Sequence, residues 1–234
     1  RYAYDGSELP LANRDVATAQ VTTRDIDRGE APHFLLKEIN EAPVSFRKTL
    51  RGKIVEQDGL LRAVVGDRSL PPEIAARLAS GEITKVRVIG QGTAAVAGRS
   101  MAAVLDDICG GRLDIDPITA TELSGFGLRL GMSDTLIVAV SQSGTTTDTN
   151  RTVDLARGRG ASVLAIVNRR NSDLTDKADG VMYTSDGRDV EMSVASTKAF
   201  YAQVAAGVLL ACAISEAAGL GTDLEHQPGQ PQRQ

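Results

Sequence analysis

Aromatic and basic residues that could form a nucleic-acid surface are scarce in this sequence. It has no Trp, its aromatic residues amount to 3%, and its formal net charge is −4. Single-stranded nucleic acid is bound on aromatic stacking platforms, and a nucleic-acid backbone is bound by clustered basic residues. Nucleic acid is therefore excluded as an expected partner, and any phosphate bound here must be held by local geometry.

Cysteine and histidine are equally rare. Cys109 and Cys212 lie in apolar helical sequence without CxxC spacing, so reduced core thiols are expected and neither a disulfide framework nor a zinc site is. His33 precedes the main domain and His226 lies in a polar tail, and neither is a convincing acid or base. We expect no metal and no cofactor.

Long hydrophobic runs are also missing. The longest candidate, residues 202–213, is interrupted by Gly207 and falls short of the roughly 20 residues that a membrane span needs. The first residues contain neither an initiator Met nor the apolar core of a signal peptide. We expect no membrane insertion and no export, and place the protein in the cytoplasm.

Composition divides the chain into three regions. Residues 1–31 are polar and weakly periodic, which is typical of a linker or the tail of a preceding domain. The chain has 234 residues and is 42% hydrophobic, which suffices for a full core, and we place this core in one domain over residues 32–222. Residues 223–234 are expected to be a disordered tail.

Strand-like and helix-like segments alternate along the main domain. The pattern predicts helical pieces over 33–50 that are broken at Pro43, then a short helix from Pro71. Strands are predicted at 86–90, 113–118, 135–140, 162–167 and 180–184. The helices between and after them are predicted at 95–109, around 122, 147–159, near 171–173 and over 195–217. This order predicts a doubly wound α/β fold, a parallel sheet with helices on both faces.

Ligands of such sheets bind beyond the carboxyl ends of the strands, so we expect a site at the loops after Ile89, Val140 and Thr184. The loop at residues 141–147 follows a strand, opens a helix, and carries hydroxyls on five of its seven residues. A helix N-terminus favours an anion, hydroxyls add rotatable donors, and Gly144 permits close approach. No Lys or Arg lies between Ser141 and Asn150, so a phosphate monoester is favoured over a nucleoside triphosphate.

Each loop also has an alternative interpretation. A Ser/Thr-rich turn caps a helix without any ligand. The loop at residues 90–95 matches the GxGxx(G/A) pattern of dinucleotide folds, with Asp114 and Asp116 about twenty residues further on, where a ribose-binding acid is expected. Ser196 or Thr197 is placed either to cap the last helix or to donate to sugar hydroxyls.

The three loops, in this order, resemble the first of the paired SIS (sugar isomerase) domains of glutamine-fructose-6-phosphate aminotransferases. The resemblance rests on Ser-Gln-Ser-Gly at 141–144 with Thr146, on Val-Ala-Ser-Thr-Lys-Ala-Phe at 194–200, and on Leu-Lys-Glu-Ile at 36–39 with Pro43 and Leu-Arg-Gly at 50–52. It covers roughly residues 34–220 and implies a flavodoxin-like three-layer sandwich.

The resemblance also implies a set of ligand contacts. The phosphate of fructose 6-phosphate or glucosamine 6-phosphate is expected at Ser141, Gln142, Ser143 and Thr146. The sugar is expected at Thr93 and Ser196, with Gly92 and Gly144 as loop glycines. The sequence departs from the family pattern at Gln91, Ala94 and Thr145.

The same resemblance implies a larger parent protein with a glutaminase domain, a second SIS domain and a homodimeric assembly. The base, the ring-opening His and the Schiff-base Lys of that family belong to the second SIS domain and the C-terminal tail, so we assign no catalytic residue here. Glu122, Glu191 and Lys198 are interpreted as ordinary surface charges. A sensor domain that binds an amino-sugar phosphate, and a dinucleotide-dependent oxidoreductase, remain the alternatives.

Overall fold

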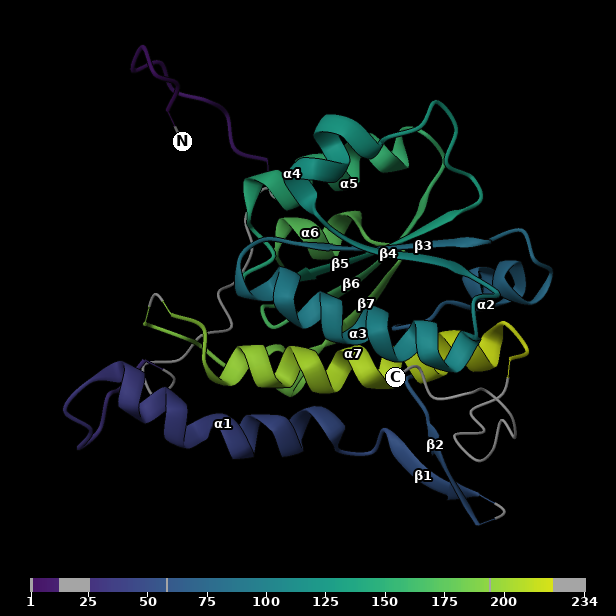
Figure 1. The fold of residues 1–234 in the computed structure, drawn as a ribbon. Coiled ribbons are helices and arrows are strands. Elements are labelled where there is room, and N and C mark those ends of the chain that lie inside the picture. The colour runs from purple at the N-terminus through teal and green to yellow at the C-terminus, as the bar shows by residue number, and fades with distance from the viewer. Residues whose placement is uncertain (1, 13–25, 58, 194, 221–234) are drawn as a thin grey trace, which may run out of the picture.

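The computed structural model in Figure 1 describes residues 2–12, 26–57, 59–193 and 195–220. His226 and the predicted tail at 223–234 lie outside these ranges, as do residue 1 and residues 13–25 of the predicted linker. The main domain follows the predicted alternation of strands and helices.

A five-stranded parallel sheet forms the centre of the domain (Figure 1). The strand order is β4-β3-β5-β6-β7, the order of flavodoxin-like sheets. Each strand matches its prediction to within a residue or two. The strands are β3 (Lys85–Gly90), β4 (Asp114–Thr119), β5 (Thr135–Ser141), β6 (Ser162–Val167) and β7 (Gly180–Tyr183).

Helices cover both faces of the sheet, as the doubly wound prediction requires (Figure 1). Successive residues of a strand point to opposite faces of the sheet, so that Val138 belongs to one apolar core and Ile137 to the other. The first core is closed by α2 (Pro72–Ala79), α3 (Thr93–Cys109) and α7 (Lys198–Ala217). The second is closed by α4 (Ala120–Glu122) with its π-helical continuation (Leu123–Gly127), α5 (Thr147–Arg157) and α6 (Asp173–Lys177).

Helix α1 (Phe34–Leu50) packs on the outer side of α7 and adds a further layer to that face (Figure 1). The predicted break at Pro43 is wrong, because α1 continues through this residue. A proline removes the hydrogen bond to the carbonyl four residues earlier. Here both Pro43 and Ile39 are exposed, so water can solvate the freed carbonyl while packing on α7 holds the helix together.

Two short elements were not predicted. Strands β1 (Ile54–Gln57) and β2 (Leu60–Ala63) form an antiparallel hairpin after α1. A 3₁₀ turn (Thr184–Gly187) follows β7 and leads into the segment that precedes α7.

Helix α7 corrects the expectation that no apolar stretch has the length of a membrane span. It has 20 residues and a mean hydropathy of 1.5 over its most apolar window, but 67% of that window is buried inside the protein. It begins at Lys198 and not at residue 195. Burial raises the pKa of Cys212 in this helix and of Cys109 in α3. Both thiols are free, and Cys109 is buried in the core whereas Cys212 is half-buried.

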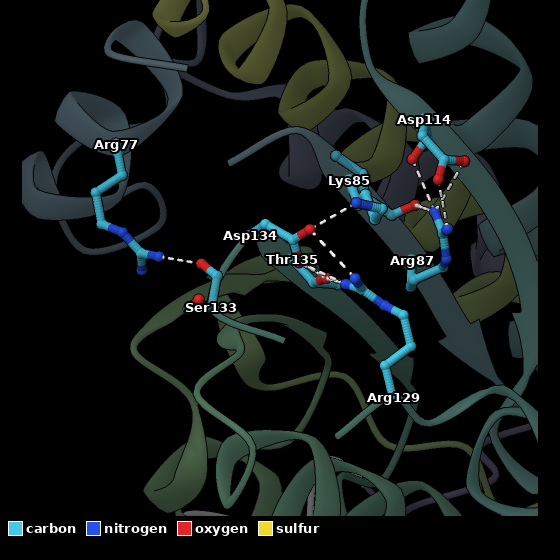
Figure 2. A network of polar contacts seen from close by, with 9 residues as sticks. Arg77, Lys85, Arg87, Asp114, Arg129, Ser133, Asp134 and Thr135 are labelled. Carbon is cyan, nitrogen blue, oxygen red and sulfur yellow. Dashed lines mark hydrogen bonds and ion pairs between the residues drawn. The ribbon is translucent and has the colours of Figure 1, made fainter. Parts of the chain in front are cut away.

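A network of ion pairs joins the amino ends of β3 and β5, at the edge of the sheet opposite the predicted site (Figure 2). Lys85 and Arg129 both contact Asp134, each at 2.5 Å, and Arg87 contacts Asp114 at 2.7 Å. Hydrogen bonds from Arg129, and then from Lys85, hold the pKa of Asp134 far below its usual range. The network ties the first residues of neighbouring strands together.

Candidate functional site

A cleft of about 210 Å³ lies at the carboxyl ends of β3 and β5. These strands are neighbours, but α3 and α5 leave them toward opposite faces of the sheet, which makes this the topological switch point where α/β folds bind ligands. The structure brings together all six predicted ligand contacts and adds residues that were not predicted as such. The lining residues are Gln91, Thr93, Ala94, Val140, Ser141, Gln142, Ser143, Thr146, Glu191, Ser193 and Ser196.

The loop after β5 is held in shape by its own hydrogen bonds. Ser141 Oγ accepts from the N–H of Gly144 at 3.0 Å, and Asn150 Nδ2 donates to the Gly144 carbonyl at 3.0 Å. Gly144 has a φ of +68°, and a Cβ built on it would lie 2.0 Å from Ser172 Oγ. Only glycine fits this position, because a side chain would meet both backbone strain and a buried neighbour.

Donor groups at the start of α5 are free to meet an anion. Thr146 is the N-cap residue of this helix, yet its side chain makes no capping hydrogen bond. Within the ranges that the structure describes, the N–H groups of Thr146 and Thr147 also have no hydrogen-bond acceptor. The capping interpretation of this loop therefore lacks its expected hydrogen bond, and the helix N-terminus keeps the unsatisfied donors that attract an anion.

Gly92 is the second predicted loop glycine, and it stands at the N-cap of α3 with a φ of +56°. It turns the chain from β3 into a helix whose first residue, Thr93, lines the cleft. Gln91 also lines the cleft and donates to Thr121 Oγ1 at 3.2 Å. The described lining residues include no Lys or Arg, so this cleft offers an anion only neutral donors.

The carboxylate of Glu191 caps helix α7, which corrects its interpretation as an ordinary surface charge. Thr197 is the N-cap residue of this helix, but its side chain makes no capping hydrogen bond. The Glu191 carboxylate accepts from the N–H groups of Thr197 at 2.8 Å and Ala199 at 3.1 Å. It also accepts from the Ser196 hydroxyl at 3.1 Å. A carboxylate already occupies the N-terminus of α7, so the free N-terminus of α5 is the better place for a ligand anion.

The segment that carries Glu191 and Ser196 is anchored by α1. Glu38 in α1 is 1% exposed, and its carboxylate accepts from the N–H of Met192 at 2.5 Å and of Ser193 at 3.3 Å. The Ser193 hydroxyl donates to the same carboxylate. Lys198 is buried and contacts Glu41 of α1 at 2.6 Å, so it is not a surface charge either.

The strand register weakens the dinucleotide interpretation. Asp114 is the first residue of β4 and lies opposite Lys85, the first residue of β3. Its carboxylate pairs with Arg87 in the network of Figure 2, and Asp116 lies only two residues further along the strand. A ribose-binding acid belongs at the carboxyl end of its strand, whereas the carboxyl end of β4 is Thr119.

The fold and the site define a flavodoxin-like α/β domain with a hydroxyl-lined cleft at the switch point of its sheet. The family model of the SIS domain matches residues 82–213, more than half of the sequence, and the chain belongs to the SIS domain family.

The chain is similar to glutamine-fructose-6-phosphate aminotransferases. It is 37% identical to that of Symbiobacterium thermophilum over 215 residues, which are 87% of this chain and 33% of the relative. It is 35% identical to that of Mycobacterium bovis over 218 residues, which are 92% of this chain and 33% of the relative. The chain thus spans about a third of the length of these relatives.

Solved structures share the fold. The C-terminal domain of glucosamine-fructose-6-phosphate aminotransferase from Francisella tularensis has a TM-score of 0.67 at 24% identity, and the match covers 84% of this chain and 51% of that one. The NanR protein of Vibrio vulnificus, solved in complex with ManNAc-6P, has a TM-score of 0.53 at 18% identity, and the match covers 82% of this chain and 64% of that one.

Proposed function

We propose that the cleft binds a phosphosugar, fructose 6-phosphate or glucosamine 6-phosphate. The observation that carries this proposal is the loop after β5, where the N-cap residue Thr146 leaves its hydroxyl unused and the first N–H groups of α5 have no acceptor. A phosphate monoester is the chemical group that such a loop fits. The relatives named glutamine-fructose-6-phosphate aminotransferase support the choice of sugar phosphate.

One group of residues binds the phosphate of the ligand, and a second group contacts its sugar. The phosphate oxygens lie at the N-terminus of α5 and accept hydrogen bonds from the side chains of Ser141, Gln142, Ser143 and Thr146. Thr93 and Ser196 contact the sugar. Because the Ser196 hydroxyl donates its hydrogen bond to Glu191, its oxygen is left to accept a hydrogen bond from a sugar hydroxyl.

The chain serves as the first isomerase half of a glutamine-fructose-6-phosphate aminotransferase-like enzyme. A chain that matches a third of such relatives is consistent with a parent protein that also has a glutaminase domain and a second SIS domain. The groups that move protons between the sugar carbons belong to those parts, and the present chain binds and orients the phosphosugar. A homodimer in the cytoplasm is part of the same proposal.

Thermal unfolding of the 234-residue chain tests the proposal. A ligand at 100 times its Kd stabilises the folded state by about 2.7 kcal/mol, so fructose 6-phosphate or glucosamine 6-phosphate should raise the midpoint. Ser143→Ala with Thr146→Ala should abolish this shift. Ser80→Ala with Thr84→Ala is the matched control, because both hydroxyls are exposed and lie away from the cleft. A shift with NAD alone would contradict the proposal.

A sensor domain for an amino-sugar phosphate is the second candidate. It is favoured by the shared fold with a protein solved in complex with ManNAc-6P. The length of the gene separates the two candidates, because a glutaminase and a second SIS repeat support the enzyme and an adjoining helix-turn-helix supports the sensor.

A further inference from the structure

A second cavity, of about 200 Å³, lies between α1, residues 188–190 and the first residue of α7. It shares no lining residue with the phosphosugar cleft. The two cavities are nevertheless lined by neighbouring parts of one segment, residues 188–190 in the second cavity and Glu191 and Ser193 in the cleft. The second cavity is lined by Lys37, Glu41, Val44, Ser45, Lys48, Arg188, Asp189, Val190 and Lys198, and we refer to it as the basic pocket.

Positive charge exceeds negative charge in the basic pocket, where four cations face two carboxylates. Both carboxylates already have a cation beside them. Glu41 lies 2.6 Å from Lys198, and Asp189 lies 3.6 Å from Lys48.

Two cations remain in excess. Lys37 is 3.6 Å from Glu41, whose closer partner is Lys198, and its ammonium also donates to the carbonyl of Asp27, which is neutral and leaves the positive charge uncompensated. Arg188 makes no ion pair and no side-chain hydrogen bond with the described residues. A guanidinium without a carboxylate partner at the wall of a cavity presents several donors in a planar fork that matches phosphate oxygens.

Ser45 provides a separate indication of a ligand. Its side chain is on the wall of the basic pocket and is 2% exposed, yet its hydroxyl has no hydrogen-bond partner among the described residues. One turn later, Thr49 is equally buried, but its hydroxyl donates to the Ser45 carbonyl and accepts from the N–H of Ser185. A buried hydroxyl without a partner is unfavourable, and an anion in the pocket would accept a hydrogen bond from it.

We propose that the basic pocket binds a small phosphate-bearing anion at a site separate from the phosphosugar cleft. Arg188 and Lys37 neutralise the anion, and Ser45 donates a hydrogen bond to it. The phosphosugar cleft holds phosphate by neutral donors, whereas the basic pocket holds it by charge. This proposal goes beyond the proposed function and does not depend on it.

Calorimetric titration with pyrophosphate tests the proposal on the full chain carrying Ser143→Ala and Thr146→Ala, which removes phosphate binding by the cleft. We expect one pyrophosphate to bind per chain. Arg188→Gln, added to this variant, should weaken pyrophosphate binding. The loss of one hydrogen bond to a charged group lowers an affinity by about tenfold, and we expect a change of that size. Arg99→Gln makes the same charge change at an exposed arginine of α3 and should leave the affinity unchanged.

Ser45→Ala gives a second readout. It should weaken pyrophosphate binding severalfold without lowering the thermal midpoint of the ligand-free chain, because the hydroxyl has no partner to lose. If the cleft variant does not fold, Arg188→Gln and Arg99→Gln are compared in the otherwise unmutated chain, where only Arg188→Gln should weaken pyrophosphate binding.

Two results would overturn the proposal: no pyrophosphate binding, or equal affinity in the Arg188→Gln, Ser45→Ala and Arg99→Gln chains. Failure of the proposed function is a different outcome. In that case neither sugar phosphate raises the thermal midpoint of the unmutated chain. If the proposed function holds, Arg188→Gln should leave this rise in the midpoint intact.

Discussion

One carboxylate oxygen of Glu191 accepts a hydrogen bond from the Ser196 hydroxyl at 3.1 Å, while its other oxygen accepts hydrogen bonds from the N–H groups of Thr197 and Ala199. One side chain therefore both caps α7 and orients a hydroxyl at the cleft. The two roles use different oxygen atoms, so substitution can separate them.

Glu191→Ala should destabilise the chain by about 1 kcal/mol, the usual effect of losing a helix cap, and weaken phosphosugar binding. Glu191→Gln keeps one oxygen for the N–H groups but replaces the acceptor of Ser196 with a donor amide. It should lower ligand affinity with a smaller loss of stability. Urea denaturation and calorimetry measure the two effects. Equal stability of the alanine variant and the unmutated chain would refute the capping role.

Glu38→Ala should release the segment around residue 192 from α1. The carboxylate is buried and accepts from Met192 and Ser193, and a hydrogen bond to a charged group contributes about 1.5–3 kcal/mol. We expect a loss of about that size, with faster hydrogen exchange at these two amides. Glu56→Ala removes an exposed carboxylate from β1 and serves as the control. Unchanged exchange in the Glu38 variant would show that α1 does not hold the segment.

Gly144→Ala should destabilise the chain by more than 1 kcal/mol, because an L-residue in the left-handed region is strained by about 1–2 kcal/mol and Ser172 occupies the space of the new methyl group. Sugar-phosphate binding should also be lost. Gly125→Ala is the matched control, since its φ is not positive and no atom lies within 4 Å of the added carbon. Similar urea midpoints for the two variants would contradict this account.

Asp134 should make the protein sensitive to acid. Hydrogen bonds from Arg129 and Lys85 lower its pKa in the folded state below the unfolded value of 3.8. Its contribution to stability is therefore full above the unfolded pKa and is lost as the pH falls below 3.8 toward the folded value. Its side chain is 33% exposed, so salt should screen part of the effect.

Asp134→Asn should lower the free energy of unfolding at neutral pH and flatten its fall between pH 4 and 2. Urea titrations across this range, at low and high salt, measure both changes. Asp107→Asn, at an exposed carboxylate of α3, is the control. Parallel pH profiles for the Asp134 variant and the unmutated chain would rule out the network as the source of acid sensitivity.

The sheet was predictable because its central strands are continuous apolar runs, as in β5 and β6, where every residue is buried. The loop at 141–147 was predictable because strand, glycine and hydroxyls are adjacent in sequence. Parallel strands with helical crossovers bring their carboxyl ends to one edge, which is why six residues from three loops meet at one cleft.

Other features depend on contacts that sequence spacing does not reveal. Glu38 and Met192 lie 154 positions apart, so no local pattern marks the carboxylate as an anchor. Pro43 is tolerated because the helix around it packs on α7. The hairpin has strands of only four residues, although the Asp-Gly pair at 58–59 is a turn signal that could have indicated it.

The family match begins at residue 82, whereas α1 ends at Leu50. A fragment cut at the start of the match would keep all five strands of the sheet and every residue that lines the cleft. It would lose Glu38, Glu41 and Thr49, and with them the partners of Ser193, Lys198 and Ser185. We therefore expect the smallest autonomous ligand-binding unit to start no later than Phe34, and deletion from the N-terminus past that residue to abolish affinity before it abolishes folding.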